Sequence, residues 1–111
     1  MDIKHESKGK ATVVSITGSL DALTAPKLTD YLTQQLSEGH HHLIVDLSGL
    51  DYTSSAGLRV MLNAVKDARS RGGDLRVAAV RPTVSKVFEM SGFTSILKFY
   101  PDLDAAVKSF A

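Results

Sequence analysis

One stretch of the sequence decides which fold the chain adopts: Val45-Asp46-Leu47-Ser48-Gly49-Leu50-Asp51-Tyr52-Thr53-Ser54-Ser55-Ala56-Gly57-Leu58. The apolar run from Leu43 to Leu47 predicts a strand, and a short polar loop then leads into a long helix that begins near Ser54 or Ser55. A hydroxyl at a helix start can accept from an unpaired backbone N–H group, so Thr53, Ser54 or Ser55 can cap this helix. The free N–H groups and the positive end of the helix dipole also favour a negative group there. A serine at this junction is therefore a candidate for receiving a phosphate.

The composition is that of an ordinary globular domain. The chain has 111 residues, of which 43% are hydrophobic and 23% charged, and its formal net charge is +1. This length supports one modest core, so residues 1–111 are expected to form a single domain. The near-neutral charge gives no reason to expect direct nucleic-acid binding. The sequence has no cysteine, no signal peptide and no apolar run of about 20 residues, so we expect a cytoplasmic protein without membrane insertion.

Strand and helix patterns alternate along the chain after an opening hairpin. Strands are expected at 2–7, 11–17, 43–47, 74–80 and 96–99, and helices at 24–39, from Ser54 or Ser55 to Gly73, at 83–90 and from Pro101 onward. In the second helix an apolar stripe is expected to face the core: Leu58, Met61, Leu62, Val65 and Ala68. This order predicts an α/β fold with a mostly parallel sheet of four to five strands, an antiparallel N-terminal edge hairpin and about four helices.

The run Thr53-Ser54-Ser55-Ala56-Gly57-Leu58, after a strand ending in Asp46-Leu47, resembles the signature of the STAS domain and, within it, of the anti-sigma factor antagonists. The resemblance covers essentially the whole chain. In the bacterial antagonists this loop typically reads Asp-Ser-(Ser or Thr)-Gly-Leu, and its first serine is phosphorylated. Aligned on Gly57-Leu58, that serine is Ser55, and Ser54 stands where the family has the aspartate.

The resemblance also implies partners and residue roles. It places the phosphorylation site at Ser55, with Ser54 and Thr53 as secondary candidates. It implies a partner-binding surface made of Asp21, Ser54, Ser55, Gly57, Leu58 and Arg59. The implied partner is an anti-sigma factor serine kinase, which binds the unphosphorylated form, and a PP2C-type phosphatase resets the switch. The protein would then regulate sigma-factor-dependent transcription as a kinase substrate, without a cofactor.

Several of these residues also have a plain structural interpretation. Asp21 follows a strand and can bond the turn backbone, and Asp46 can do the same at the end of its own strand. Ser54 and Ser55 can be simple helix caps. Leu58 is either a core residue or an apolar contact at the rim of an interface.

Other functional classes have weaker support in the sequence. Adjacent residues such as His40, His41 and His42 do not converge on one ion, so no metal site is predicted. Gly-x-Ser-x-Gly, Walker and dinucleotide patterns are absent, and nothing in the sequence brings a histidine to Ser55 as a base, so no enzymatic activity is predicted. The open alternatives are a STAS subunit of a signalling assembly or of a lipid or anion transport system, and a nucleotide-binding regulator.

Overall fold

The computed structural model describes residues 1–92 and 95–111. Its elements in chain order are β1 (Asp2–Lys8), β2 (Ala11–Leu20), α1 (Ala25–Ser37), β3 (His42–Thr53), α2 (Ser55–Ser70), β4 (Asp74–Ala78), α3 (Pro82–Met90), β5 (Lys98–Tyr100) and α4 (Leu103–Ser109). Among the helices described, none combines the length and the apolar character needed to cross a membrane.

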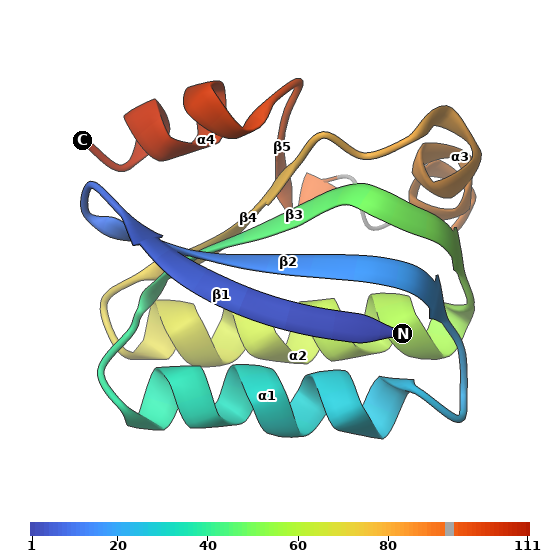
Figure 1. Cartoon of the computed structure of the whole chain (residues 1–111), viewed down its shortest axis with the longest axis horizontal. Helices are drawn as coiled ribbons and strands as arrows, with labels where there is room; N and C mark the ends of the chain where they lie inside the picture. The colour runs from blue at the N-terminus through green and yellow to red at the C-terminus, as the bar shows by residue number, and fades with distance from the viewer. Residues whose placement is uncertain (93–94) are drawn as a thin grey trace.

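Within the residues that the structure describes, a five-stranded sheet forms the middle of the molecule, with its strands in the order β1-β2-β3-β4-β5. β1 pairs with β2 in antiparallel orientation, and the other neighbours are parallel. α1 and α2 cover one face of the sheet, α4 lies on the other, and α3 packs against β3 (Figure 1). The predicted α/β fold, with its N-terminal edge hairpin and four helices, is therefore confirmed.

The core lies between the sheet and the α1–α2 layer. The apolar stripe of α2 is buried as the spacing predicted, and Leu58, Met61 and Val65 are fully inaccessible to solvent. A smaller cluster fills the opposite face, where Val13 and Ile44 meet Ala106 of α4. Both faces of the central strand β3 are therefore covered, which explains its nearly continuous apolar sequence.

β3 is longer than its sequence predicts. It does not end at Leu47 in a loop but continues to Thr53, paired with β2, which itself continues to Leu20 instead of ending at Thr17. The ladder extends this far through two register shifts. Such irregularities bend and twist a strand, and here they accommodate the polar and glycine residues that suggested a loop.

Arg81 stabilises the part of β3 after Leu47, which the sequence did not predict as a strand. Its Nε donates to the Ser48 carbonyl oxygen at 2.8 Å, and its guanidinium pairs with the Asp51 carboxylate. Arg81 is the N-cap residue of α3, so the start of this helix holds the polar second half of β3 in place.

Smaller differences concern the last two strands. β4 ends at Ala78 rather than at residue 80, because Ala79 has a φ of 57°, in the left-handed region that ends an extended strand. β5 covers Lys98–Tyr100 rather than 96–99. The segment Ser91-Gly92-Phe93 resembles the family's turn before its last strand, and it lies partly outside the described residues, because Phe93 is not among them.

Candidate functional site

The carboxyl ends of β2 and β3 bring two distant loops together. Leu20 and Thr53 are register partners, and the Ser54 N–H group donates to the Leu20 carbonyl oxygen at 2.8 Å. The chain leaves β2 through Asp21 and leaves β3 through Ser54 and Ser55. The turn at Asp21 and the start of α2 therefore lie side by side at one edge of the sheet (Figure 1).

Of the three hydroxyl residues at this junction, only Ser55 is exposed. Thr53 is buried, and its hydroxyl donates to the Ser54 carbonyl oxygen at 3.1 Å. The Oγ atom of Ser54 is also buried, whereas Ser55 is the exposed first residue of α2. The first turn of this helix carries no acidic side chain, so its positive dipole end is not neutralised there. The geometry thus separates Ser55 from the two secondary candidates by accessibility.

Ser54 occupies the N-cap position of α2 without acting as a side-chain cap. Its φ and ψ of −92° and 173° are those of a typical N-cap residue, but its side chain makes no capping hydrogen bond. Within the described part of the chain its buried Oγ has no hydrogen-bond partner at all. The expectation that a hydroxyl side chain caps this helix is therefore wrong, because the Ser54 Oγ is buried away from the free N–H groups.

Replacing Ser54 by alanine is expected to leave the stability unchanged or to raise it slightly. A buried oxygen without a partner costs free energy, and its removal breaks no hydrogen bond. The matched control is Asp102→Ala, because the Asp102 Oδ1 accepts the Ala105 N–H at 2.8 Å and does cap α4. Losing that cap should cost about 1 kcal/mol. Urea unfolding of both variants checks this, and an equal loss of stability in both would contradict it.

Asp21 is a turn residue that also shapes the surface of the site. Its Oδ1 accepts the N–H groups of Leu23 and Thr24, at 2.9 Å and 3.0 Å. The hydrogen bond from the Thr24 N–H is the main cause that lowers the pKa of the Asp21 carboxyl below its ordinary value. Thr24 precedes α1 at its N-cap, yet its hydroxyl accepts from the Asp21 N–H at 2.9 Å instead of capping the helix. The turn interpretation of Asp21 agrees with these contacts.

This turn exposes an apolar side chain that sequence reasoning missed. Leu23 is 90% exposed, and Tyr52, near the end of the neighbouring strand β3, is 52% exposed. This end of the sheet therefore carries two exposed apolar side chains as well as the Ser55 hydroxyl. The sequence gives one sign of this exposure, because Leu23 lies outside the apolar stripe of α1, which consists of Ala25, Leu28, Leu32 and Leu36.

Two residues of the implied partner-binding set lie beneath the surface. Leu58 is fully buried in the core, and Gly57 is buried as well. A Cβ atom on Gly57 would lie 2.5 Å from the Thr53 Oγ1 and 2.6 Å from the Leu20 Cδ2, so only glycine lets α2 approach both strand ends. Both residues hold the helix start in place, while Arg59 is exposed on the next turn.

The other polar residues singled out in the sequence have local contacts. The Asp46 Oδ1 accepts the Ser48 N–H at 3.0 Å, as the structural interpretation expected. The His40 Nδ1 is 2.7 Å from the Gln35 Oε1, and the His42 ring stacks on Phe110 with 5.1 Å between centroids. In the described part of the chain, no three side chains of the His, Cys, Asp and Glu types form a group that could hold a metal ion.

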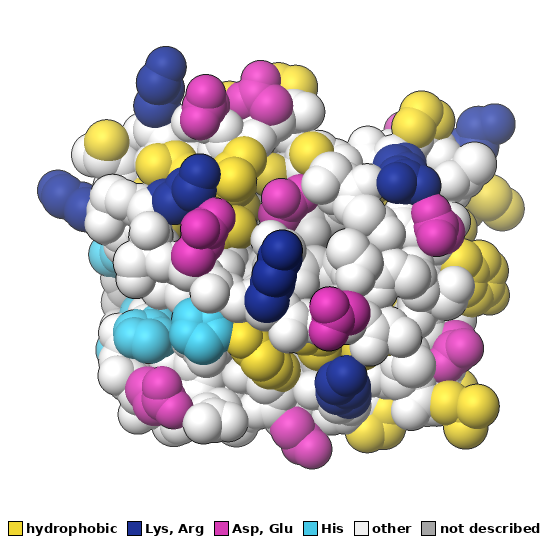
Figure 2. Space-filling model, in the orientation of Figure 1, with side chains coloured by type: hydrophobic (Ala, Val, Ile, Leu, Met, Phe, Trp, Pro, Cys, Tyr) yellow, Lys and Arg dark blue, Asp and Glu magenta, His cyan; other side chains and the backbone are white. Residues whose placement is uncertain are grey.

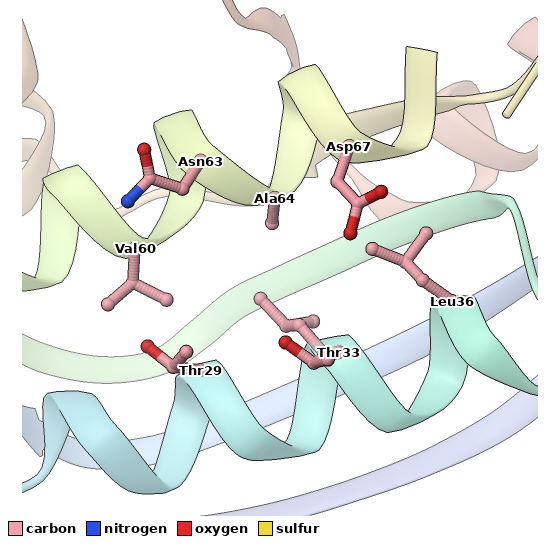
Figure 3. A pocket seen from close by; sticks show the side chains of 8 residues that line it. Thr29, Thr33, Leu36, Val60, Asn63, Ala64 and Asp67 are labelled. Carbon is pink, nitrogen blue, oxygen red and sulfur yellow. The ribbon is translucent and has the colours of Figure 1, made fainter. Parts of the chain in front are cut away.

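A hollow of about 100 Å³ lies between α1 and α2, and Figure 3 shows the side chains that line it. Thr29 and Thr33 from α1 face Val60, Asn63 and Asp67 from α2. Ordinary ligand pockets occupy roughly 300 Å³ or more, so this hollow does not fit a nucleotide. It also lies further along α2 than Ser55 and is separate from the loop site.

Comparisons with known proteins point to one family. The family model of the STAS domain matches residues 2–106. BtrV of Bordetella bronchiseptica, named as an anti-sigma factor antagonist, is 37% identical over 98 residues, which cover 88% of this chain and 84% of BtrV. The anti-sigma-B factor antagonist of Staphylococcus aureus is 25% identical over 97 residues, covering 87% and 90% of the two chains. An anti-sigma factor antagonist from Mycobacterium paratuberculosis has a crystal structure that matches with a TM-score of 0.89 at 25% identity, covering 97% of this chain and 92% of the other. This chain therefore belongs to the STAS domain family.

Proposed function

We propose that this protein is an anti-sigma factor antagonist that binds a kinase-type anti-sigma factor and is released when Ser55 is phosphorylated. The observation that carries the proposal is the position of Ser55, an exposed hydroxyl at the N-terminus of α2 beside the Asp21 turn. The names of the curated relatives support the class of partner. Bound to such a factor, the unphosphorylated protein would free a sigma factor for transcription.

The binding surface in this proposal is the loop edge of the sheet. Asp21 and Leu23 lie in the turn after β2, Tyr52 lies near the end of β3, which leads into the helix start that carries Ser55, and Arg59 is exposed on the next turn of α2. An exposed leucine beside polar groups suits an anchor in a partner pocket, with the polar groups at its rim. Gly57 and Leu58 contribute by fixing the position of the helix start rather than by contact.

Phosphate on Ser55 would act differently on the free protein and on the complex. In the free protein it would lie at the positive end of the α2 dipole, which tolerates about two added negative charges. In the complex those charges would be removed from water at the centre of the interface, which costs free energy unless the partner neutralises them. The complex would therefore dissociate, and a PP2C-type phosphatase would restore binding.

The decisive experiment isolates the protein from its native host, determines its intact mass and maps the modified peptide. The same lysate supplies a capture experiment with the unmodified and modified forms. Phosphate on Ser55, with an anti-sigma factor kinase captured mainly by the unmodified form, is the expected result. An unmodified protein in every growth condition, captured instead with a transporter or a large assembly, would contradict the switch and favour a docking subunit. Saturable binding of ATP or GTP by the purified protein would favour the nucleotide-binding alternative.

Replacing Leu23 by aspartate tests the surface independently of phosphorylation. The side chain is 90% exposed, so the fold should lose no measurable stability. Binding of the anti-sigma factor should weaken by about tenfold, because an apolar anchor is lost and a charge is added at the interface. Ser70→Asp adds the same charge at the opposite end of α2 and should leave affinity unchanged, as measured by calorimetry. Equal affinities of both variants would exclude Leu23 from the interface.

A further inference from the structure

β1 presents a free backbone edge on the side of the sheet away from β2. It is the outermost strand, and in Figure 1 it lies nearest the viewer with no element in front of it. Gly9 and Lys10 join it to β2 in a two-residue turn, in which Gly9 has a φ of 58° and Lys8 faces Ala11. In a turn of this type the flanking pair is hydrogen-bonded. Pairing then alternates along the strand, because every second residue directs its N–H and C=O groups to β2.

The residues between these pairs direct their backbone groups outward. They are Ile3, His5 and Ser7, each one position away from a residue that bonds β2. Three N–H and three C=O groups therefore line the free edge in regular order. Such an edge is a template for another strand unless something blocks it, and β1 contains no proline.

The side chains between these positions carry alternating charges. Asp2, Lys4, Glu6 and Lys8 share one face of β1, and all four are exposed. Figure 2 shows dark blue and magenta side chains alternating along the line that β1 follows in Figure 1. Inside the chain they are only loosely paired, since the single ion pair among them joins the Lys8 Nζ and the Glu6 Oε1 at 3.9 Å, both side chains being exposed. These charges are available to a partner strand.

We infer that β1 pairs with β1 of a second copy of this chain, antiparallel and centred on His5. In this register Lys4 faces Glu6 of the other copy and Asp2 faces its Lys8, so the two-fold axis generates four pairs of opposite charge. His5 faces His5, and Ile3 faces Ser7. Every outward-directed backbone group then meets an outward-directed group, which is the condition for a hydrogen-bonded antiparallel ladder.

The two nearest alternative registers are disfavoured by the same charges. The two strands can form hydrogen bonds only in registers that place the outward-directed residues of one copy opposite those of the other. With the axis at Lys4, lysine faces lysine and Asp2 faces Glu6. With the axis at Glu6, glutamate faces glutamate and Lys4 faces Lys8. Like charges directly opposite destabilise a strand pair, so both of these registers are disfavoured. The registers centred on Ile3 and Ser7 keep opposite charges face to face but overlap only residues 2–4 or 6–8 of β1. The register centred on His5 therefore gives the longest ladder in which only opposite charges meet.

The paired charges also lie where they act most strongly. They occupy the non-hydrogen-bonded positions of the new ladder, in which opposite side chains approach more closely than in the hydrogen-bonded ones. The resulting sheet has ten strands, and its two-fold axis is normal to the sheet. The loop edges that carry Ser55 then point in opposite directions and stay exposed, so this dimer is independent of the proposed function.

A charge swap tests the inference with the full chain. Sedimentation velocity from about 10 μM to about 1 mM should detect a weak dimer that dissociates as salt rises from about 0.05 M to about 0.5 M. Lys4→Glu and Glu6→Lys should each weaken dimerisation by tenfold or more, because each turns two attractive pairs into repulsive ones. The double variant Lys4→Glu/Glu6→Lys restores opposite charges and should restore the dimer. Lys10→Glu, in the adjoining turn, makes the same charge change outside the ladder and should have no effect.

A second readout locates the interface. Amide exchange measured by NMR should slow at Ile3, His5 and Ser7 as the protein concentration rises, and not at Lys4 or Glu6, which already bond β2. A monomer at every concentration would overturn the inference. A dimer that is insensitive to both single variants, or that the double variant fails to restore, would show that another surface is used.

Discussion

Replacing Ser55 by glutamate is expected to weaken binding of a kinase-type anti-sigma factor by about 30-fold or more while slightly stabilising the free protein. Ser55 is the exposed first residue of α2, whose first turn has no acidic side chain. A carboxylate there interacts favourably with the helix dipole, which is worth about 0.3–1 kcal/mol. At the centre of an interface the same charge loses its water, and a penalty of about 2 kcal/mol corresponds to the expected loss of affinity.

The opposite signs of the two effects make the prediction specific. A variant that merely damages the fold would lose stability and affinity together. Ser55→Glu should instead gain stability and lose affinity. The control Ser70→Glu places the same residue at the other end of α2, about 22 Å along the helix. There the dipole is unfavourable, so stability should fall slightly while affinity stays unchanged. Thermal unfolding and calorimetric titration measure both quantities, and full binding by Ser55→Glu would rule out charge at this position as the release signal.

The sequence predicted the fold from features that act locally. The α2 stripe of Leu58, Met61 and Val65 repeats at helical spacing, and the apolar run from Leu43 to Leu47 needs two covered faces. The order of strands and helices then leaves few possible topologies, because crossovers between parallel strands are right-handed. Each of these inferences depends on the chain's own pattern rather than on a distant partner, and the structure confirms them.

The second half of β3 could not be predicted in this way. Between Ser48 and Thr53 the chain carries glycine, aspartate and serine, which favour turns when the chain is considered alone. Pairing with β2 through shifted registers and support from Arg81 keep it extended. Both interactions come from segments about 30 residues away in the chain, so no local pattern indicates them.

For the same reason, the sequence predicts the candidate site only in part. Ser55 and Asp21 could be singled out by motif, but burial decides which hydroxyl is accessible, and burial depends on how closely α2 approaches Leu20 and Thr53. The exposure of Leu23 likewise follows from the turn that Asp21 organises, which hydrogen-bond geometry reveals and composition does not.

Asp74, at the start of β4, forms a charge cluster that the sequence did not reveal. Its side chain is 9% exposed, its Oδ1 accepts from the Arg69 Nε at 2.9 Å, and its Oδ2 accepts from the Arg76 Nε at 3.0 Å. Arg76 in turn donates to the Ser109 carbonyl oxygen at 2.7 Å and lies 4.0 Å from the Phe110 ring centroid. One carboxylate therefore joins the end of α2, strand β4 and the end of α4.

Replacing Asp74 by asparagine is expected to cost about 3 kcal/mol of unfolding free energy, because the amide leaves Arg76 largely buried without its counter-charge. Asp67→Asn is the matched control. Its carboxylate pairs with Arg71 at 2.9 Å on the surface, with both side chains more than a third exposed, so that change should cost less than about 1 kcal/mol. Urea unfolding at neutral pH measures both, and equal midpoints would show that the Asp74 cluster contributes no more than a surface pair.

The dependence of this difference on pH identifies its electrostatic origin. Burial raises the pKa of the Asp74 carboxyl, but hydrogen bonds from Arg76 and Arg69 and the charge of Arg69 outweigh it, so the pKa lies below the ordinary value of 3.8. A carboxyl that binds its proton less tightly in the folded state than in the unfolded state stabilises the fold fully above the unfolded pKa, and loses this contribution as pH falls through the folded one. The stability difference between the natural protein and Asp74→Asn should therefore stay constant from pH 7 to about pH 5 and shrink below about pH 4. A difference that stayed constant through this acid range would mean that asparagine destabilises by packing rather than by loss of charge.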